Sequence, residues 1–193
     1  FYSPLKACDP YLRFVFLTGI TKFSQLSVFS ELNNITNVSM LPDYAAICGI
    51  TENEILAQMK DDVDALAQKL EVISEEVLAK LKENYDGYHF TYPSPDIYNP
   101  FSLLNAFADG KFNSYWFGSG TLTYLIKMLD KFGVAPSEIG RKTAVAEDFD
   151  APTERMVSIT PLLYQSGYIT IKDYDKELDL YTLDTVSYTH LTL

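Results

Sequence analysis

The segment at residues 14–24, FVFLTGITKFS, constrains the possible fold more than any other part of this chain. It opens with residues 14–17, an unbroken apolar run that is rich in aromatic and β-branched side chains. A run without polar alternation is typical of a strand buried on both faces of a parallel sheet. Polar residues follow at Thr21, Lys22 and Ser24, and ligands of open α/β sheets bind just past the carboxyl ends of the strands. The segment therefore predicts either a phosphate-handling sheet edge or an ordinary strand exit with solvated polar residues.

The chain beyond residue 50 is predicted to be mostly helical. Thr51 begins a capping box with Glu54 at the third helical position, which predicts a helix over residues 52–70. Asn99 as the N-cap and Pro100 at the first helical position start another helix. Further helices are predicted at residues 25–32, 74–84, 121–132 and 152–165, and a short strand at 38–41 or 44–48.

A hairpin is predicted near the end of the chain. Residues 168–172 and 178–183 have the composition of two strands, and residues 173–177 join them. Earlier in the chain, Gly87 interrupts the helical pattern and is the natural residue for a left-handed backbone. Helices followed by a hairpin predict a small helical domain with a β wing.

Composition and charge exclude several classes of function. The chain of 193 residues carries 26 acidic and 15 basic residues, a net charge of −11, which disfavours binding to a phosphate backbone. Two isolated cysteines, Cys8 and Cys48, fit a reducing compartment and indicate a cytoplasmic location. Neither they nor His89 and His190 have metal-ligand spacing, so we expect no metal site. The sequence has no apolar stretch of about 20 residues, so we expect no membrane span.

The sequence also lacks the motifs of a self-sufficient catalytic site. It contains no G-x-x-x-x-G-K-[ST], no G-x-G-x-x-G and no G-x-S-x-G. His89 lies beside a turn and His190 lies in the tail, so no Ser/His/Asp set is proposed from the sequence. We therefore expect no catalytic residues in this chain by itself.

Several phrases, in order, resemble the bacterial AAA-ATPase-like family. They are FVFLTGITKFSQLSVFSELNNITNVSM, YAAICGITENEI, NYDGYHF, YNPFSLLNAF and YWFGSGT. The resemblance covers roughly residues 1–184. Full members of that family pair a P-loop NTPase domain with a C-terminal nuclease-like domain of the PD-(D/E)XK type. The chain begins without Met, and the resemblance implies an internal fragment that has the NTPase core upstream and the nuclease-like domain downstream as its partners.

The resemblance implies an α/β fragment followed by a lid. Residues 1–50 would be the C-terminal end of a P-loop NTPase parallel sheet, and residues 51–184 a mostly helical lid domain with a β-hairpin wing. ATP and Mg²⁺ would be cofactors of the complete parent protein, and none is expected for the fragment. The cofactor-binding residues would be Thr21 and Lys22, at the sensor position after the strand at residues 14–17.

The last residues, 185–193, depart from the resemblance. SYTHLTL resembles translated sequencing-adapter read-through and is expected to be non-native, although its apolar residues would also suit a genuine strand. His190 is therefore left out of the functional reasoning.

Two functions follow as alternatives. In the first, the chain is the sensor strand and lid of an ATP-dependent switch that lacks its own phosphate-binding loop. In the second, it is a non-enzymatic, acidic, aromatic-rich interaction module whose partner surface contains Tyr85, Tyr88, Tyr115 and Trp116. The ordinary alternative for these aromatic residues is packing between lid and core.

Overall fold

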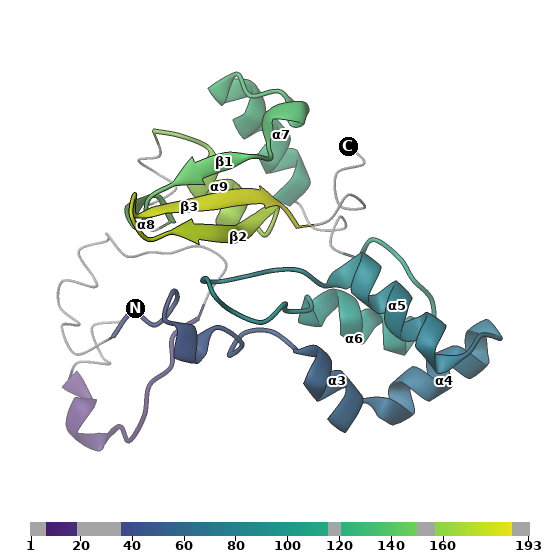
Figure 1. Ribbon diagram of the computed structural model, residues 1–193. Helices are drawn as coiled ribbons and strands as arrows, with labels where there is room; N and C mark the ends of the chain where they lie inside the picture. The colour runs from purple at the N-terminus through teal and green to yellow at the C-terminus, as the bar shows by residue number, and fades with distance from the viewer. Residues whose placement is uncertain (1–6, 19–35, 116–120, 150–156, 187–193) are drawn as a thin grey trace.

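The computed structural model describes residues 7–18, 36–115, 121–149 and 157–186, and these residues have an α/β architecture (Figure 1). Its α-helices are α3 (Glu52–Gln58), α4 (Lys60–Leu70), α5 (Ser74–Tyr85), α6 (Pro100–Asp109), α7 (Thr121–Phe132), α8 (Ala146–Phe149) and α9 (Thr160–Gln165). Its strands are β1 (Lys142–Ala144), β2 (Ile169–Asp175) and β3 (Leu180–Thr185). Short 3-10 helices are η1 (Asp9–Tyr11), η2 (Pro42–Tyr44) and η4 (Pro136–Glu138).

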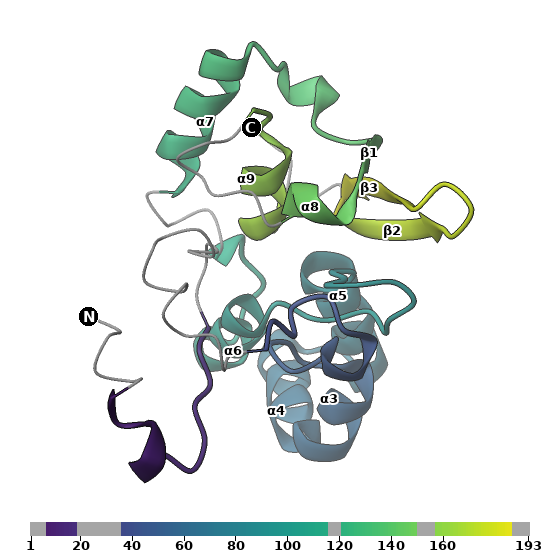
Figure 2. The same cartoon turned by 90° about the vertical axis from the view of Figure 1, so that its left-hand side faces the viewer.

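Helices α3 to α6 enclose one hydrophobic cluster, which we call the helical cluster. Its buried residues are Ile55, Val63, Leu66, Ala67, Val77, Leu81, Tyr85, Tyr98, Leu103 and Ala106. In Figures 1 and 2 these four helices lie together on one side of the sheet. The apolar residues recur at helical spacing, so each helix turns one apolar stripe toward the others.

Local sequence signals set the ends of these helices. The Thr51 side chain accepts from the Glu54 amide, and the Glu54 carboxylate accepts from the Thr51 amide, which confirms the capping box. The Asn99 side chain accepts from the Ser102 amide at the start of α6, as Asn99-Pro100 predicts. The predicted helix over residues 52–70 is divided in two, because the backbone of Met59 leaves the helical region at φ −119° and ψ 21°. The bend leaves the apolar residues of both halves in one cluster.

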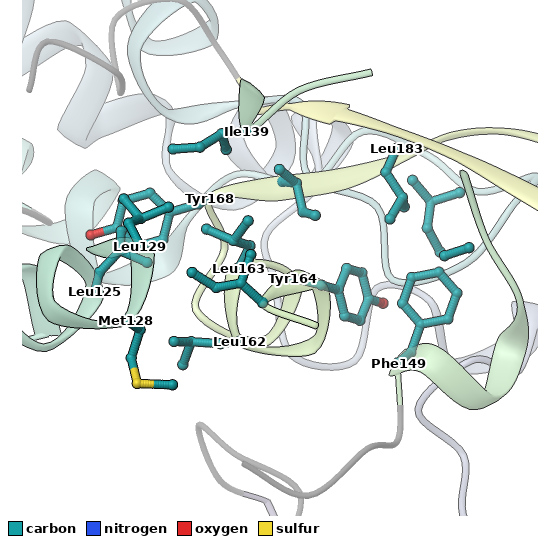
Figure 3. Packing of buried hydrophobic residues seen from close by; sticks show 14 residues of the cluster. Leu125, Met128, Leu129, Ile139, Phe149, Leu162, Leu163, Tyr164, Tyr168 and Leu183 are labelled. Atoms are coloured by element: carbon teal, nitrogen blue, oxygen red, sulfur yellow. The ribbon is translucent and has the colours of Figure 1, made fainter. Parts of the chain in front are cut away.

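A second hydrophobic cluster, which we call the sheet cluster, lies between the sheet and helices α7 to α9. Its buried residues are Leu125, Met128, Leu129, Ile139, Ala144, Phe149, Ile159, Leu162, Leu163, Tyr164, Tyr168, Ile169, Ile171 and Leu183. Figure 3 shows Leu125 and Leu129 of α7 near Leu163 of α9, and the ring of Tyr164 beside that of Phe149. The two ring centroids are 4.6 Å apart. The predicted helix at residues 121–132 is confirmed as α7, whereas that at residues 152–165 is described only from residue 157 on and appears there as α9.

The sheet is antiparallel, with strand order β1-β3-β2. Strands β2 and β3 form the predicted hairpin, in which Ile171 is paired with Leu183 and a bulge follows between Ile171 and Asp173. The sequence did not predict β1, which has only three residues and is an edge strand. No parallel pairing occurs within the described residues, so the part of a P-loop sheet that we expected in residues 1–50 is not seen there.

The prediction of a buried strand at residues 14–17 is wrong for this structure. These residues have no strand pairing, and Phe14 is 81% exposed. An apolar run forms a strand only when a neighbouring strand accepts its backbone hydrogen bonds, and no described residue does so. The alternative short strands at 38–41 and 44–48 are likewise turns around η2. The predicted helix at residues 25–32 lies outside the described residues.

Candidate functional site: the segment between the two clusters

Residues 85–98, which we call the junction segment, run from the end of α5 to the start of α6 and contact both clusters. Tyr85 and Tyr98, at its two ends, are buried in the helical cluster. The middle of the segment is hydrogen-bonded to β2 and α9 of the sheet cluster. It therefore joins residues that are distant in sequence.

Two tyrosine hydroxyls form hydrogen bonds between the segment and α9. The Tyr88 hydroxyl donates to the carbonyl oxygen of Tyr164 over 2.9 Å, and the Tyr164 hydroxyl donates to that of Phe90 over 3.0 Å. The rings of Tyr88 and Tyr164 are stacked, with centroids 6.0 Å apart. Burial raises the pKa of Tyr88 well above its ordinary value, so the hydroxyl keeps the proton that it donates.

Thr170 of β2 makes a second link to the segment. Its buried hydroxyl accepts from the His89 amide over 2.6 Å and donates to the His89 carbonyl over 3.1 Å. One threonine thus satisfies both backbone groups of one residue, as a neighbouring strand would. Lys172 adds a longer contact of 3.4 Å from its ammonium to the Gly87 carbonyl.

The segment also forms backbone hydrogen bonds within itself and with the chain before α3. Tyr88 and Ile97 exchange backbone hydrogen bonds of 3.3 and 3.1 Å, and Tyr98 pairs with Ile50 in the same way. Gly87 has φ +96°, which confirms the predicted left-handed residue. These pairings fix the segment as a narrow loop.

The loop brings together a serine, a histidine and an aspartate that the sequence did not suggest as a set. His89 Nδ1 lies 2.9 Å from Ser94 Oγ, and His89 Nε2 lies 2.8 Å from Asp96 Oδ1. The Ser94 hydroxyl donates to the carbonyl of Thr91 over 2.8 Å.

This set resembles a catalytic triad in composition and differs from it in its hydrogen bonding. A triad needs the serine proton to pass to the imidazole, whereas the Ser94 proton is directed to the Thr91 carbonyl. The set therefore braces the loop and does not form a nucleophile. The only signal for it in the sequence is the closeness of residues 89–96, which turn-forming prolines also explain.

Asp86 is the most unusual ionisable group of the segment. It is 5% exposed, and its Oδ1 is a buried side-chain oxygen without a hydrogen-bond partner among the described residues. Burial raises the pKa of this carboxyl to about 6. The sequence did not single out Asp86, because a sequence pattern does not reveal which aspartate is buried.

The residues predicted to bind cofactor, Thr21 and Lys22, lie outside the described residues, as do Trp116 and His190. Of the predicted aromatic surface, Tyr85 is buried and its hydroxyl donates to the carbonyl of Asn113 over 3.0 Å.

Tyr88 and Tyr115 are equally committed to contacts within the fold. The Tyr88 hydroxyl binds Tyr164, and the Tyr115 hydroxyl donates to the Lys111 carbonyl over 3.1 Å. The three described tyrosines of the predicted surface thus make their contacts within the fold.

The described residues provide neither a metal cluster nor a membrane-spanning helix. They contain no group of three or more His, Cys, Asp or Glu side chains placed to hold a metal ion. None of their helices combines the length and the apolar character that crossing a bilayer requires.

The fold and this segment define an α/β protein with two hydrophobic clusters and a hydrogen-bonded connection between them. The chain is similar to a protein of Azotobacter chroococcum mcd 1 described as an uncharacterized protein in the vnfD 5' region. The two are 35% identical over 173 residues, which cover 88% of this chain and 31% of that protein. The chain therefore spans about a third of the length of this relative. No family model and no solved structure matches the chain.

Proposed function

We propose that the chain is the lid region of an ATP-dependent switch in a longer, cytoplasmic protein of the AAA-ATPase-like kind. The proposal is supported by the five ordered phrases that resemble this family and by the greater length of the Azotobacter relative. The phosphate-binding loop and the Mg²⁺ ligands would lie in the NTPase core upstream, and a nuclease-like domain would follow downstream. In this proposal the chain supplies movement and sensing, and the upstream core supplies most of the contacts to ATP.

The observation that carries the proposal is the junction segment, residues 85–98. A lid transmits a change of state only if its connection to neighbouring parts has a defined geometry. Here the hydrogen bonds of the Tyr88 and Tyr164 hydroxyls and the double contact of Thr170 with His89 supply that geometry. The segment includes NYDGYHF, one of the phrases that resemble the family.

Thr21 and Lys22 are the proposed sensor residues of this switch. A threonine hydroxyl can donate to a γ-phosphate oxygen or position the attacking water, and a lysine can supply charge. Side chains of successive residues in an extended chain point to opposite sides, so the two would not contact the same phosphate. Thr21 ranks first because its reach is short and its geometry is better defined.

ATP turnover by variants of the full-length parent protein tests this function. We expect Thr21→Ala or Lys22→Met to lower ATP turnover at least about tenfold, equivalent to ~1.4 kcal/mol. We also expect Tyr88→Phe, which removes the hydroxyl that binds Tyr164, to lower turnover while ATP binding is kept. Tyr92→Phe, an exposed position in the same segment, is the matched control and should behave like the parent.

Thermal stability is measured alongside, so that loss of folding is separated from loss of turnover. If the parent protein hydrolyses no ATP, or all of these variants hydrolyse it at the parental rate, the switch is rejected.

A non-enzymatic interaction module is the second candidate. Phe101 and Leu104 on α6 are 60% and 50% exposed and lie one helical turn apart. Exposed apolar side chains at this spacing are compatible with a partner helix or strand, although single exposed apolar residues are common. A gene whose coding region upstream of this chain lacks a phosphate-binding loop would favour this candidate over the switch.

A further inference from the structure

Asp86 is buried at a point in the fold where the charge of its carboxyl affects the junction segment. Asp86 is the C-cap of α5, where the chain leaves the helical cluster and enters the contacts with β2 and α9. The residue is 5% exposed, and the buried Oδ1 has no hydrogen-bond partner among the described residues. A buried carboxylate oxygen without a donor is costly, and the negative end of the α5 dipole adds to that cost.

The charged groups around Asp86 compensate its charge only in part. Lys82, one turn earlier on α5, is paired with Glu52 of α3 over 3.4 Å. Asp96, across the loop, is paired with His89 over 2.8 Å.

The pKa of the Asp86 carboxyl follows from these surroundings. Desolvation by burial raises this pKa most, a hydrogen bond from the Gly87 backbone lowers it, and Asp96 raises it further. Lys82 lowers the pKa and Glu52 raises it, both by smaller amounts. The nearby Tyr98 hydroxyl is neutral, because burial and the negative charge of Asp86 raise its pKa.

We propose that Asp86 is a proton-operated latch that holds the junction segment against β2 and α9 when it is protonated and weakens that contact when it is ionised. The neutral carboxylic acid carries no charge and is compatible with a buried site, and its protonated oxygen becomes a hydrogen-bond donor. The ionised carboxylate gains free energy by moving toward water. The residues that follow it, from Gly87 to Phe90, carry the contacts with Lys172, Tyr164 and Thr170, so such a movement would disturb those contacts.

The sign of the effect follows from the two protonation equilibria. In the closed state, in which the junction segment contacts β2 and α9, the pKa of Asp86 is about 6. In an open state, in which Asp86 is solvated, this pKa returns toward the ordinary 3.8. The closed state therefore binds the proton more tightly, and closing is favoured at low pH. The preference is lost as the pH rises through about 6. Between pH 5 and pH 7.5 the closing equilibrium should weaken about tenfold.

Hydrogen exchange of the complete 193-residue chain tests the latch. Peptides covering residues 86–98 are compared with peptides covering α4, at pH 5 to 7.5, after correction for the intrinsic effect of pH on exchange. We expect the protection of residues 86–98, relative to α4, to fall about tenfold over this range. Asp86→Asn, which is neutral and of similar shape, should show a flat profile. Glu83→Gln, an exposed acid on the same helix, is the matched control and should retain the wild-type profile.

Three results would overturn the latch. One is a wild-type profile that is flat relative to α4, and this result is decisive even if Asp86→Asn does not fold. Another is an equal loss of protection in α4, which would indicate global unfolding instead of a local opening. The third is an Asp86→Asn profile that keeps the wild-type dependence on pH, which would assign the proton to another group.

Discussion

Two hydrogen bonds join Thr170 to His89, and their loss should lower the stability of the fold. Thr170 is fully buried, and its hydroxyl both accepts from and donates to the backbone of His89, at 2.6 and 3.1 Å. Thr170→Val keeps the shape of the side chain and removes both hydrogen bonds. Each bond contributes about 0.5–1.5 kcal/mol net, and backbone groups left without partners add to the loss. We expect the free energy of unfolding to fall by about 2–3 kcal/mol.

Thr170→Ser is the matched comparison for this change. Serine keeps the hydroxyl and loses one buried methyl group, which costs about 1 kcal/mol. Thr182→Val, at an exposed position on β3, controls for the change of threonine to valine in a strand and should stay within about 0.5 kcal/mol of the wild type. The order of stability should therefore be wild type, then Thr170→Ser, then Thr170→Val.

Urea denaturation followed by far-ultraviolet circular dichroism measures these differences. Hydrogen exchange at the His89 amide gives a local measurement, because Thr170→Val should expose this amide more than Thr170→Ser does. If Thr170→Val is as stable as Thr170→Ser, the hydroxyl contributes nothing to the junction, and the reasoning from these two hydrogen bonds is refuted.

Two further predictions concern the start of α3 and the binding of nucleotide. Thr51→Ala should remove the capping box and lower the free energy of unfolding by about 1 kcal/mol in urea denaturation. Because the hydrogen bonds from Thr51 lower the pKa of Glu54, this loss should shrink as the pH falls through that pKa, and an unchanged loss in acid would contradict the capping role. The chain alone carries no phosphate-binding loop, so we expect calorimetry with Mg-ATP to show no binding tighter than about 100 μM. Tighter binding would mean that this chain contacts phosphate by itself.

The sequence by itself determined the features that depend on neighbouring residues. The capping box at Thr51, the Asn99-Pro100 start of α6 and the left-handed Gly87 are all present in the structure. So is the hairpin of β2 and β3, whose strands are only a few residues apart. In each case the stabilising partner lies within a few positions along the chain, so a short pattern contains the whole interaction.

Only the tertiary structure decided the features that depend on distant partners. Residues 14–17 have the composition of a buried strand and are exposed, because composition does not supply the neighbouring strand that completes one. The contacts of Tyr88 with Tyr164 and of His89 with Thr170 join residues 76 and 81 positions apart. Asp86 belongs to the same category, because the pKa of its carboxyl depends on burial and on charges from the junction segment, α5 and α3. An aspartate before a glycine has the pattern of a solvated turn, and only the packing of these elements removes it from water.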